Sequence, residues 1–173
     1  MSTDLNIQQA GLEDASMLAE LGAKTFKDAF GAQNNPTDLE KYLSEAFTPE
    51  KMNEELADSE SSFFVAYLDG EPAGYIKLRT SKQPDCIEDP TPIELERIYV
   101  HQHCIGKGVG AALMQEAMRQ GKAAGFNTLW LGVWKENQQA ITFYKKWEFE
   151  VVGEHEFVVG TDVQHDHIMA RSL

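Results

Sequence analysis

The N-terminal third of the chain carries apolar residues at helical spacing. A short strand is predicted at residues 7–10, and apolar side chains then recur every three to four positions over residues 12–30, which predicts an amphipathic helix. A second short helix is predicted to open at Pro36. The run Thr48-Pro49-Glu50-Lys51 places a capping side chain before a proline at the first helical position, so a third helix is predicted to begin there and to end before Ser59.

The pattern changes to strands after residue 60. Apolar runs flank Asp69-Gly70, which is typical of a two-residue hairpin turn, and three prolines in residues 81–92 indicate a loop. Farther along, alternating strands and helices imply a parallel pair of strands, whereas hairpins imply antiparallel neighbours. The pattern therefore predicts a mixed α/β sheet covered by helices. Its predicted strands are 63–68, 73–79, 93–100, 128–134, 149–153 and 166–170, and its later helices are 108–124 and 137–146.

The charge balance is strongly acidic. Fifteen Lys and Arg residues against 28 Asp and Glu residues give a net charge of −13, which repels nucleic acids and anionic membranes and attracts small cations. We therefore expect no nucleic acid or membrane partner, and the charge indicates either simple solubility or a cationic substrate. The chain has 173 residues and no apolar run of membrane-spanning length. We expect one domain, residues 1–173, in the cytoplasm, with a homodimer left open.

One glycine-rich segment, Ile105-Gly106-Lys107-Gly108-Val109-Gly110-Ala111, lies between a predicted strand and a predicted helix. Glycines allow a tight turn and a close approach to a ligand. The first amides of a helix have no internal partners, so with the helix dipole they form an anion site, to which Lys107 adds a positive charge. The segment predicts a site for linked phosphates. A dinucleotide-binding fingerprint, which usually occupies the first strand–helix unit, and a purely structural turn are the alternatives.

The same segment resembles the loop motif Gln/Arg-x-x-Gly-x-Gly/Ala of the GCN5-related N-acetyltransferase (GNAT) superfamily, with Ile105 at the first position. Two more blocks are similar, in the right order: Leu95-Glu96-Arg97-Ile98-Tyr99-Val100 to the family's fourth strand, and Asn137-Gln138-Gln139-Ala140-Ile141-Thr142-Phe143-Tyr144 to a helix motif. Glu148-Phe149 stands where the family has Gly-Phe, and a left-handed backbone there costs a glutamate about 1–2 kcal/mol. The resemblance implies a mostly antiparallel sheet with a central parallel strand pair and helices on both faces. It also implies an N-acetyltransferase that uses acetyl-CoA.

Within the superfamily, Trp130-Leu131-Gly132-Val133-Trp134-Lys135-Glu136-Asn137, Phe143-Tyr144-Lys145-Lys146 and the closing segment 166–173 are most similar to spermine/spermidine acetyltransferases of the PaiA type. This resemblance implies a primary amine as acceptor and, with the net charge, favours a polyamine such as spermidine or spermine. Acetylation of a protein N-terminus or lysine is the alternative enzyme function. A CoA-binding sensor without turnover and a non-catalytic interaction domain are the alternatives outside catalysis.

Acetyl transfer needs a base for the amine, and Glu96 is the candidate because it lies on the strand that leads into the glycine segment. Glu94 lies on the same strand face by alternation and is a candidate for binding the substrate. For either residue, simple pairing with a cation is the alternative.

The transferred carbonyl also needs hydrogen-bond donors, which strand 93–100 is expected to supply. Its apolar residues Leu95, Ile98 and Val100 do not share a period of two, and a β-bulge would reconcile them. The resembled family has such a bulge, and its free amide near Ile98–Tyr99 would face the thioester oxygen. A strand buried on both faces gives the same mixed pattern.

Tyr144 is the candidate acid for the departing thiolate, because a phenol with a pKa of about 10 is protonated at pH 7. Asn137, Ala140 and Tyr144 share a helix face, on which Ala140 leaves room for the cofactor. A core tyrosine is the alternative for Tyr144, and Lys146 is expected at the nucleotide phosphate unless it is simply a solvated charge. The predicted cofactor-binding residues are Ile98, Tyr99, Val100, Ile105, Gly106, Lys107, Gly108, Val109, Gly110, Ala111, Asn137, Ala140, Tyr144 and Lys146.

The remaining candidates concern the acceptor and metals. Phe26 and Phe30 are predicted, with Glu94, to line the substrate pocket, which the resemblance places between the first helices and the loops on the sulfur side of the cofactor. The pairs His101-x-His103 and His165-x-His167 would give a metal only two ligands each, so no metal is predicted. The two cysteines, Cys86 and Cys104, are expected to be structural thiols.

Overall fold

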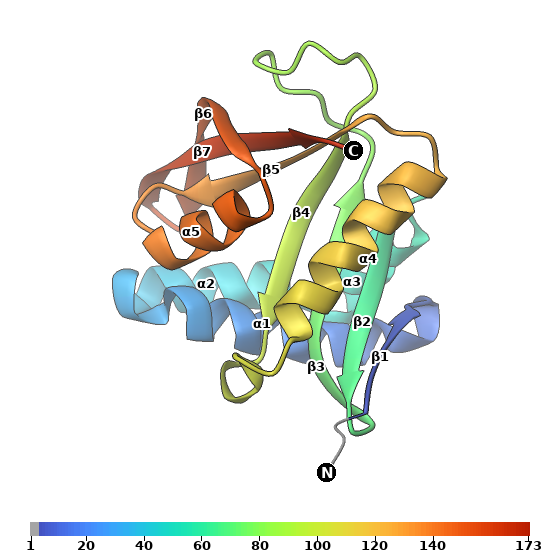
Figure 1. Ribbon diagram of the computed structural model, residues 1–173. Helices are drawn as coiled ribbons and strands as arrows, with labels where there is room; N and C mark the ends of the chain where they lie inside the picture. The colour runs from blue at the N-terminus through green and yellow to red at the C-terminus, as the bar shows by residue number, and fades with distance from the viewer. Residues whose placement is uncertain (1–3) are drawn as a thin grey trace.

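A seven-stranded sheet runs through the computed structural model, which describes residues 4–173 (Figure 1). The strand order is β1-β2-β3-β4-β5-β7-β6, and all neighbours are antiparallel except β4 and β5, which are parallel. The predicted mixed sheet with a central parallel pair is therefore confirmed. The strands are β1 (Leu5–Gln9), β2 (Ser61–Leu68), β3 (Glu71–Arg79), β4 (Ile93–Val100), β5 (Thr128–Trp134), β6 (Glu150–Val159) and β7 (Asp162–Ser172).

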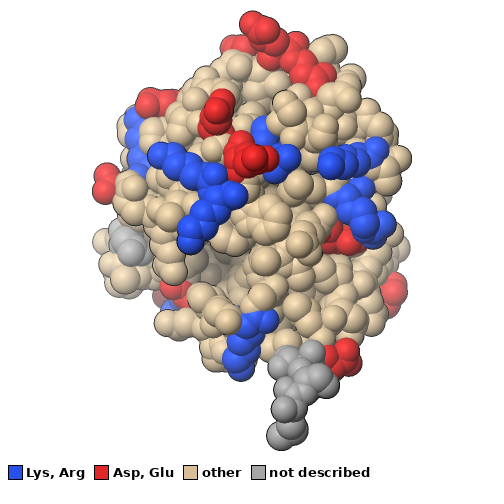
Figure 2. Space-filling view, in the orientation of Figure 1, with Lys and Arg blue, Asp and Glu red and all other residues tan. Residues whose placement is uncertain are grey.

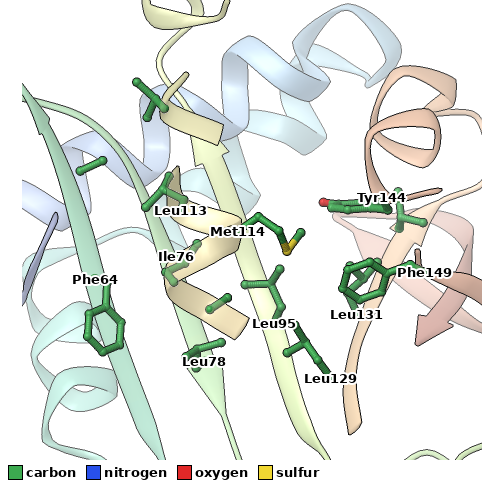
Figure 3. Close-up of a cluster of buried hydrophobic side chains, with 14 of the residues drawn as sticks. Phe64, Ile76, Leu78, Leu95, Leu113, Met114, Leu129, Leu131, Tyr144 and Phe149 are labelled. Atoms are coloured by element: carbon green, nitrogen blue, oxygen red, sulfur yellow. The ribbon is translucent and has the colours of Figure 1, made fainter. Parts of the chain in front are cut away.

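Helices cover both faces of this sheet, as predicted. The helices are α1 (Ala15–Phe30), α2 (Pro36–Ala46), α3 (Pro49–Ala57), α4 (Val109–Ala123) and α5 (Gln138–Lys146), with 3₁₀ turns at Leu12–Asp14, Gly31–Gln33 and Gln102–Cys104. On one face, α1 and α3 bury a cluster that includes Leu18, Met52 and Tyr75. On the other, α4 and α5 bury the larger cluster around Leu113 and Tyr144 (Figure 3).

Local sequence signals place the first helices correctly. The side chain of Asn35 accepts hydrogen bonds at the start of α2, and Thr48 Oγ1 accepts one from the Lys51 amide (3.0 Å) at the start of α3. Some boundaries differ from the prediction. Residues 12–14 form a 3₁₀ turn that leaves Leu12 exposed, and β1 spans Leu5–Gln9 rather than residues 7–10.

A β-bulge in β4 accounts for its irregular apolar pattern. Leu78 of β3 pairs with Leu95, but the preceding Lys77 pairs with Arg97, so Glu96 is the extra residue. The bulge turns Leu95, Ile98 and Val100 towards the α4 cluster. A bulge is thus present in this strand, as predicted, and its extra residue is Glu96.

The parallel pair β4–β5 is short, and the two strands then diverge. Their register contains Ile93 with Leu129 and Glu94 with Trp130, whereas β4 continues to Val100 and β5 to Trp134. Figure 1 shows β4 running beside β3 while β5 turns away with β7, β6 and α5. Beyond Glu94, the β5 side of β4 is therefore not occupied by β5.

The C-terminal hairpin is longer than predicted: β6 spans ten residues rather than five, and β7 spans eleven. Few apolar residues occur in residues 154–167, so the strand signal there is weak. Hydrogen bonding to neighbouring strands stabilises this hairpin, since β7 lies between β5 and β6 and pairs with both. Phe149 lies before β6, after Glu148, whose φ of +68° is left-handed, so the strain that the motif position would impose on a glutamate is present.

Candidate active site

The glycine segment forms an open helix start. Gly106 and Gly108 have φ values of +88° and +84°, and a Cβ on either would meet nothing within 4 Å. The Ala112 amide donates to the Gly108 carbonyl (3.1 Å), which is the first hydrogen bond of the helix. The amides of residues 109–111 come before it, so they have no helical carbonyl to donate to. Gly108 provides no side-chain cap. The geometry is that of an anion site built from backbone N–H groups.

Exposed lysines occur in the turn that begins α4 and at the end of α5. Lys107 is exposed within the turn, and Lys145 and Lys146 are exposed at the end of α5. Figure 2 shows Lys and Arg side chains over α5 and near the turn that begins α4. Although the whole chain carries a net charge of −13, these lysines make the surface beside the helix start locally attractive to phosphates. Ile105, also exposed, contributes no charge.

Helix α5 brings a phenol to the divergence of β4 and β5. Asn137 is its N-cap, and the Asn137 side chain accepts a hydrogen bond from the Ala140 amide (3.2 Å). The Tyr144 side chain is buried, and Figure 3 shows its ring extending from α5 towards β4 with the hydroxyl at the leading end. Burial raises the pKa of Tyr144. The phenol therefore stays protonated at neutral pH and is able to donate a proton.

The end of β4, the start of α4 and α5 meet at one point. A Cβ on Gly110 would lie 3.6 Å from the Phe143 ring and 3.9 Å from the Val100 side chain. Three segments of the predicted cofactor site, far apart in sequence, are therefore in contact around Gly110.

The backbone of β4 offers donors beside the same point. The His101 amide donates to the Ala73 carbonyl of β3 (2.7 Å). Amides alternate in direction along a strand, so those of Ile98 and Val100 point away from β3, to the side where pairing with β5 has ended. The Tyr99 amide points towards β3. Of the two residues expected to supply an amide for the thioester oxygen, Ile98 has the suitable direction.

An ion-pair network surrounds Glu94 and Glu96 on the opposite face of the sheet. Lys77 Nζ lies 2.7 Å from Glu96 Oε2, and Arg79 Nη1 lies 3.4 Å from Glu96 Oε1. Arg79 Nη2 lies 2.6 Å from Glu94 Oε1. Because Arg79 pairs with both carboxylates, the two glutamates do share a face, as the sequence predicts. The Lys77 side chain is only 5% exposed, so its charge is removed from bulk solvent.

Helix α3 adds a third carboxylate to this network. Glu55 pairs with Lys77 and with Arg97 Nη2 (2.9 Å). None of these partners, Lys77, Arg79, Arg97 and Glu55, was predicted from the sequence. The one available signal was the alternation of charged residues on strands β3 and β4, and Glu55 lies too far away in sequence to be paired with either strand.

The pKa values of the two strand carboxylates, Glu94 and Glu96, are shifted in opposite directions. Burial raises the pKa of Glu96, but the charges of Arg97, Lys77 and Arg79 outweigh it and hold the pKa below its ordinary value. Burial raises the pKa of Glu94 above its ordinary value despite Arg79. Glu96 is therefore an anion at neutral pH and a weaker base than an ordinary glutamate.

Aromatic rings gather beside this network at the end of β5. The Phe30 ring lies 6.2 Å from that of Tyr99 and 6.4 Å from that of Trp134, and all three side chains are half-buried. We call Phe30, Tyr99 and Trp134 the aromatic group. Phe26, 3% exposed, packs behind it against Phe30 and Tyr99 and supports the group rather than offering a surface. The sequence places Trp134 in the core or at an edge of the site, but nothing near it in sequence indicates its contact with Phe30 of α1.

Strand β5 separates the two halves of the site. Leu129, Leu131 and Val133 point into the cluster that contains Tyr144. By alternation, Trp130, Gly132 and Trp134 point to the opposite face, where the aromatic group lies. The glycine segment and Tyr144 thus lie on one side of the sheet, and the ion-pair network and aromatic group on the other.

The remaining sequence candidates lie outside this arrangement. The rings of His101 and His103 are 4.5 Å apart, but within residues 4–173 no three His, Cys, Asp or Glu side chains lie close enough to hold a metal. Both cysteines are free; Cys104 is buried and Cys86 is exposed. In the described part of the chain, no helix is both long and apolar enough to cross a lipid bilayer.

Known proteins with similar sequences and structures are consistent with this geometry. The family model for the acetyltransferase (GNAT) family matches residues 27–149. An uncharacterised N-acetyltransferase of Lactobacillus delbrueckii is 34% identical over 99% of both chains, and a spermidine N(1)-acetyltransferase of Thermoplasma acidophilum is 25% identical over 85% of this chain and 89% of its own. The crystal structure of the PaiA N-acetyltransferase of Thermoplasma acidophilum, in complex with coenzyme A, has the same fold, with a TM-score of 0.78 and 23% identity over 98% and 99% of the two chains.

The family match covers well over half of the chain, and the Lactobacillus relative exceeds 30% identity along almost its entire length. The family match runs from the end of α1 to the residue before β6, and the Lactobacillus match covers nearly all of the elements described above. The chain therefore belongs to the acetyltransferase (GNAT) family and is an N-acetyltransferase that uses acetyl-CoA.

Proposed function

We propose that this enzyme acetylates a primary amine of a polyamine such as spermidine or spermine. The observation that carries the proposal is the contact of β4, α4 and α5 around Gly110. This contact brings together, on one side of the sheet, the anion site at the start of α4, the β4 amides that point away from β3, and the buried phenol of Tyr144. The other side offers carboxylates and aromatic rings to a cationic acceptor.

The residues of the helix start fit the pyrophosphate of coenzyme A. Two left-handed glycines with open space beside them allow a close approach to the backbone, and the amides of residues 109–111 have no earlier helical partner. Lys107 adds positive charge at the pyrophosphate, and Lys146 adds it for the single phosphate on the nucleotide ribose. We assign Ile105, Gly106, Gly108, Val109, Gly110 and Ala111 to the pyrophosphate, and Ile98, Tyr99, Val100, Asn137 and Ala140 to the arm that carries the thioester.

The bound donor supplies an activated acetyl group as a thioester. The amine nitrogen bonds to the acetyl carbon, the carbon–sulfur bond breaks, and the amine loses one proton while the thiolate gains one. The Ile98 amide stabilises the negative charge that develops on the carbonyl oxygen. Tyr144 donates its proton to the departing sulfur and regains one from solvent.

Glu96 receives the amine proton through a water molecule. Its pKa is held low by Arg97, Lys77 and Arg79, which makes it a poor base for a free ammonium ion. Once the nitrogen bonds to carbon, however, its proton becomes strongly acidic, and a weak base then suffices. Only about one alkyl amine in 10³ is neutral at pH 7, so the neutral form must be selected before attack.

The polyamine assignment has two supports. The net charge of −13 favours a cationic substrate, and one relative is named a spermidine N(1)-acetyltransferase. Acetylation of a protein N-terminus or lysine is the second candidate, because the same chemistry serves any primary amine.

A panel of acceptors, assayed for CoA release, tests the proposal. We expect spermidine and spermine to have a higher kcat/KM than peptides with free N-termini or lysines. The thermal shift with CoA is the control for a functional site. If CoA binds while only peptides react, the polyamine assignment is wrong; if no amine reacts, the protein is a CoA-binding sensor.

Replacing Gly108 with Ala is expected to weaken CoA binding about tenfold, or about 1.4 kcal/mol. An alanine with a left-handed backbone costs about 1–2 kcal/mol. Without CoA the turn can relax to another conformation and avoid this strain, whereas with CoA bound it must keep the left-handed conformation. Calorimetry measures the change. Gly125→Ala is the matched control, because Gly125 also has a left-handed φ (+87°) and open space but lies at the other end of α4. Equal CoA affinities for the two variants would contradict the assignment.

A further inference from the structure

Asp166 of β7 is a buried carboxylate without a Lys or Arg partner among the described residues. It is 7% exposed, and its Oδ1 accepts no hydrogen bond from any residue of the described chain. The nearest base is His155, whose Nε2 lies 3.8 Å from Oδ2. Glu94, buried to the same extent, differs because Arg79 lies 2.6 Å away.

A buried carboxylate normally has a cation or several donors beside it. Burial raises the pKa of Asp166, and the neighbouring histidines His155, His167 and His165 only partly oppose this effect. The side chain therefore lacks the cation that its burial demands. A positively charged ligand would supply it.

The position of Asp166 indicates which positively charged ligand it would bind. Asp166 pairs with Trp134 of β5 on one side and with His155 of β6 on the other, so the three side chains share a face. On this face the His155 ring fills the room above Gly132, since a Cβ on Gly132 would lie 2.7 Å from that ring and 3.6 Å from Asp166 Oδ2. The carboxylate thus lies beside the aromatic group, where the acceptor is expected.

We propose that Asp166 binds a second, unreacted ammonium group of the acceptor and so selects polyamines over monoamines. This inference rests on the proposed function and names the residue that recognises its substrate. A polyamine that presents one neutral nitrogen for attack keeps charge on another nitrogen, a propyl or butyl chain away. Trp134 and Phe30 pack against that chain, and aromatic faces also attract the cation.

Asp166→Asn tests the assignment, because it keeps the shape of the side chain and removes its charge. We expect the KM for spermidine to rise at least about tenfold, as for a lost buried charge pair, while kcat and the Kd for CoA stay within about twofold. The KM for n-butylamine, which has no second cation, should not change. Asp69→Asn is the matched control: it removes the same charge in the exposed turn between β2 and β3.

An unchanged KM for spermidine would overturn the assignment and make Asp166 a structural carboxylate. That result differs from failure of the proposed function, in which wild-type enzyme binds CoA and acetylates no polyamine. If Asp166→Asn does not fold, Asp166→Glu decides. Moving the carboxylate by one methylene should change the ratio of KM values for putrescine and cadaverine, whereas an unchanged ratio would count against substrate contact.

Discussion

Replacing Tyr144 with Phe is expected to lower kcat about 100-fold, within the range that general acid catalysis contributes. The substitution keeps the buried ring but removes the proton for the departing sulfur. The Kd for CoA should stay the same, because the phenol acts on the leaving group rather than on the phosphates. Burial raises the pKa of Tyr144, so the phenol stays protonated and the deficit should persist from pH 7 to pH 9. Initial rates of CoA release across that range measure it.

Tyr67→Phe is the matched control for this experiment. Tyr67 lies on β2, which β3 separates from β4, so loss of its hydroxyl should leave kcat unchanged. If Tyr144→Phe keeps its full kcat, Tyr144 is a core tyrosine and water protonates the thiolate. A rate deficit that disappears when acetyl-CoA is saturating would instead indicate a role in binding the donor.

Replacing Glu55 with Gln is expected to lower the free energy of unfolding by about 3 kcal/mol. Glu55 pairs with both Lys77 and Arg97 beneath α3, and all three side chains are at most 15% exposed. Removing the Glu55 charge leaves two buried cations only partly neutralised. Removing one partner of a buried ion pair costs about 3–5 kcal/mol when no other charge compensates. Glu96 remains beside Lys77 and Arg97, so we expect the lower end. Denaturant unfolding monitored by circular dichroism measures the change.

The neighbouring residue provides the control. Glu54→Gln makes the same substitution on α3, but Glu54 is exposed and its Oε2 lies 3.8 Å from Nζ of Lys51, which is also exposed, so its loss should cost less than about 0.5 kcal/mol. Equal stability of the two variants would mean that the buried network contributes nothing.

Interactions within a few residues could be predicted from the sequence. The cap at Thr48, the hairpin turn at Asp69-Gly70 and the left-handed glycines before α4 depend on neighbouring atoms, and the structure agrees with all three. The strained backbone of Glu148 also follows from its position in a motif. The start of α4, which forms the anion site, is also a feature that depends on residues close in sequence.

The acceptor side of the site depends on pairing between distant strands, which the sequence does not encode locally. The Glu96 bulge, the divergence of β4 from β5 and the length of β6 and β7 all depend on register. Glu55 reaches Lys77 across 22 positions, and Asp166 meets Trp134 only because β7 lies beside β5. Turns, caps and amphipathic periods are properties of a short segment, so sequence alone reveals them. Which buried charge finds a partner, and which does not, depends on packing across the whole sheet.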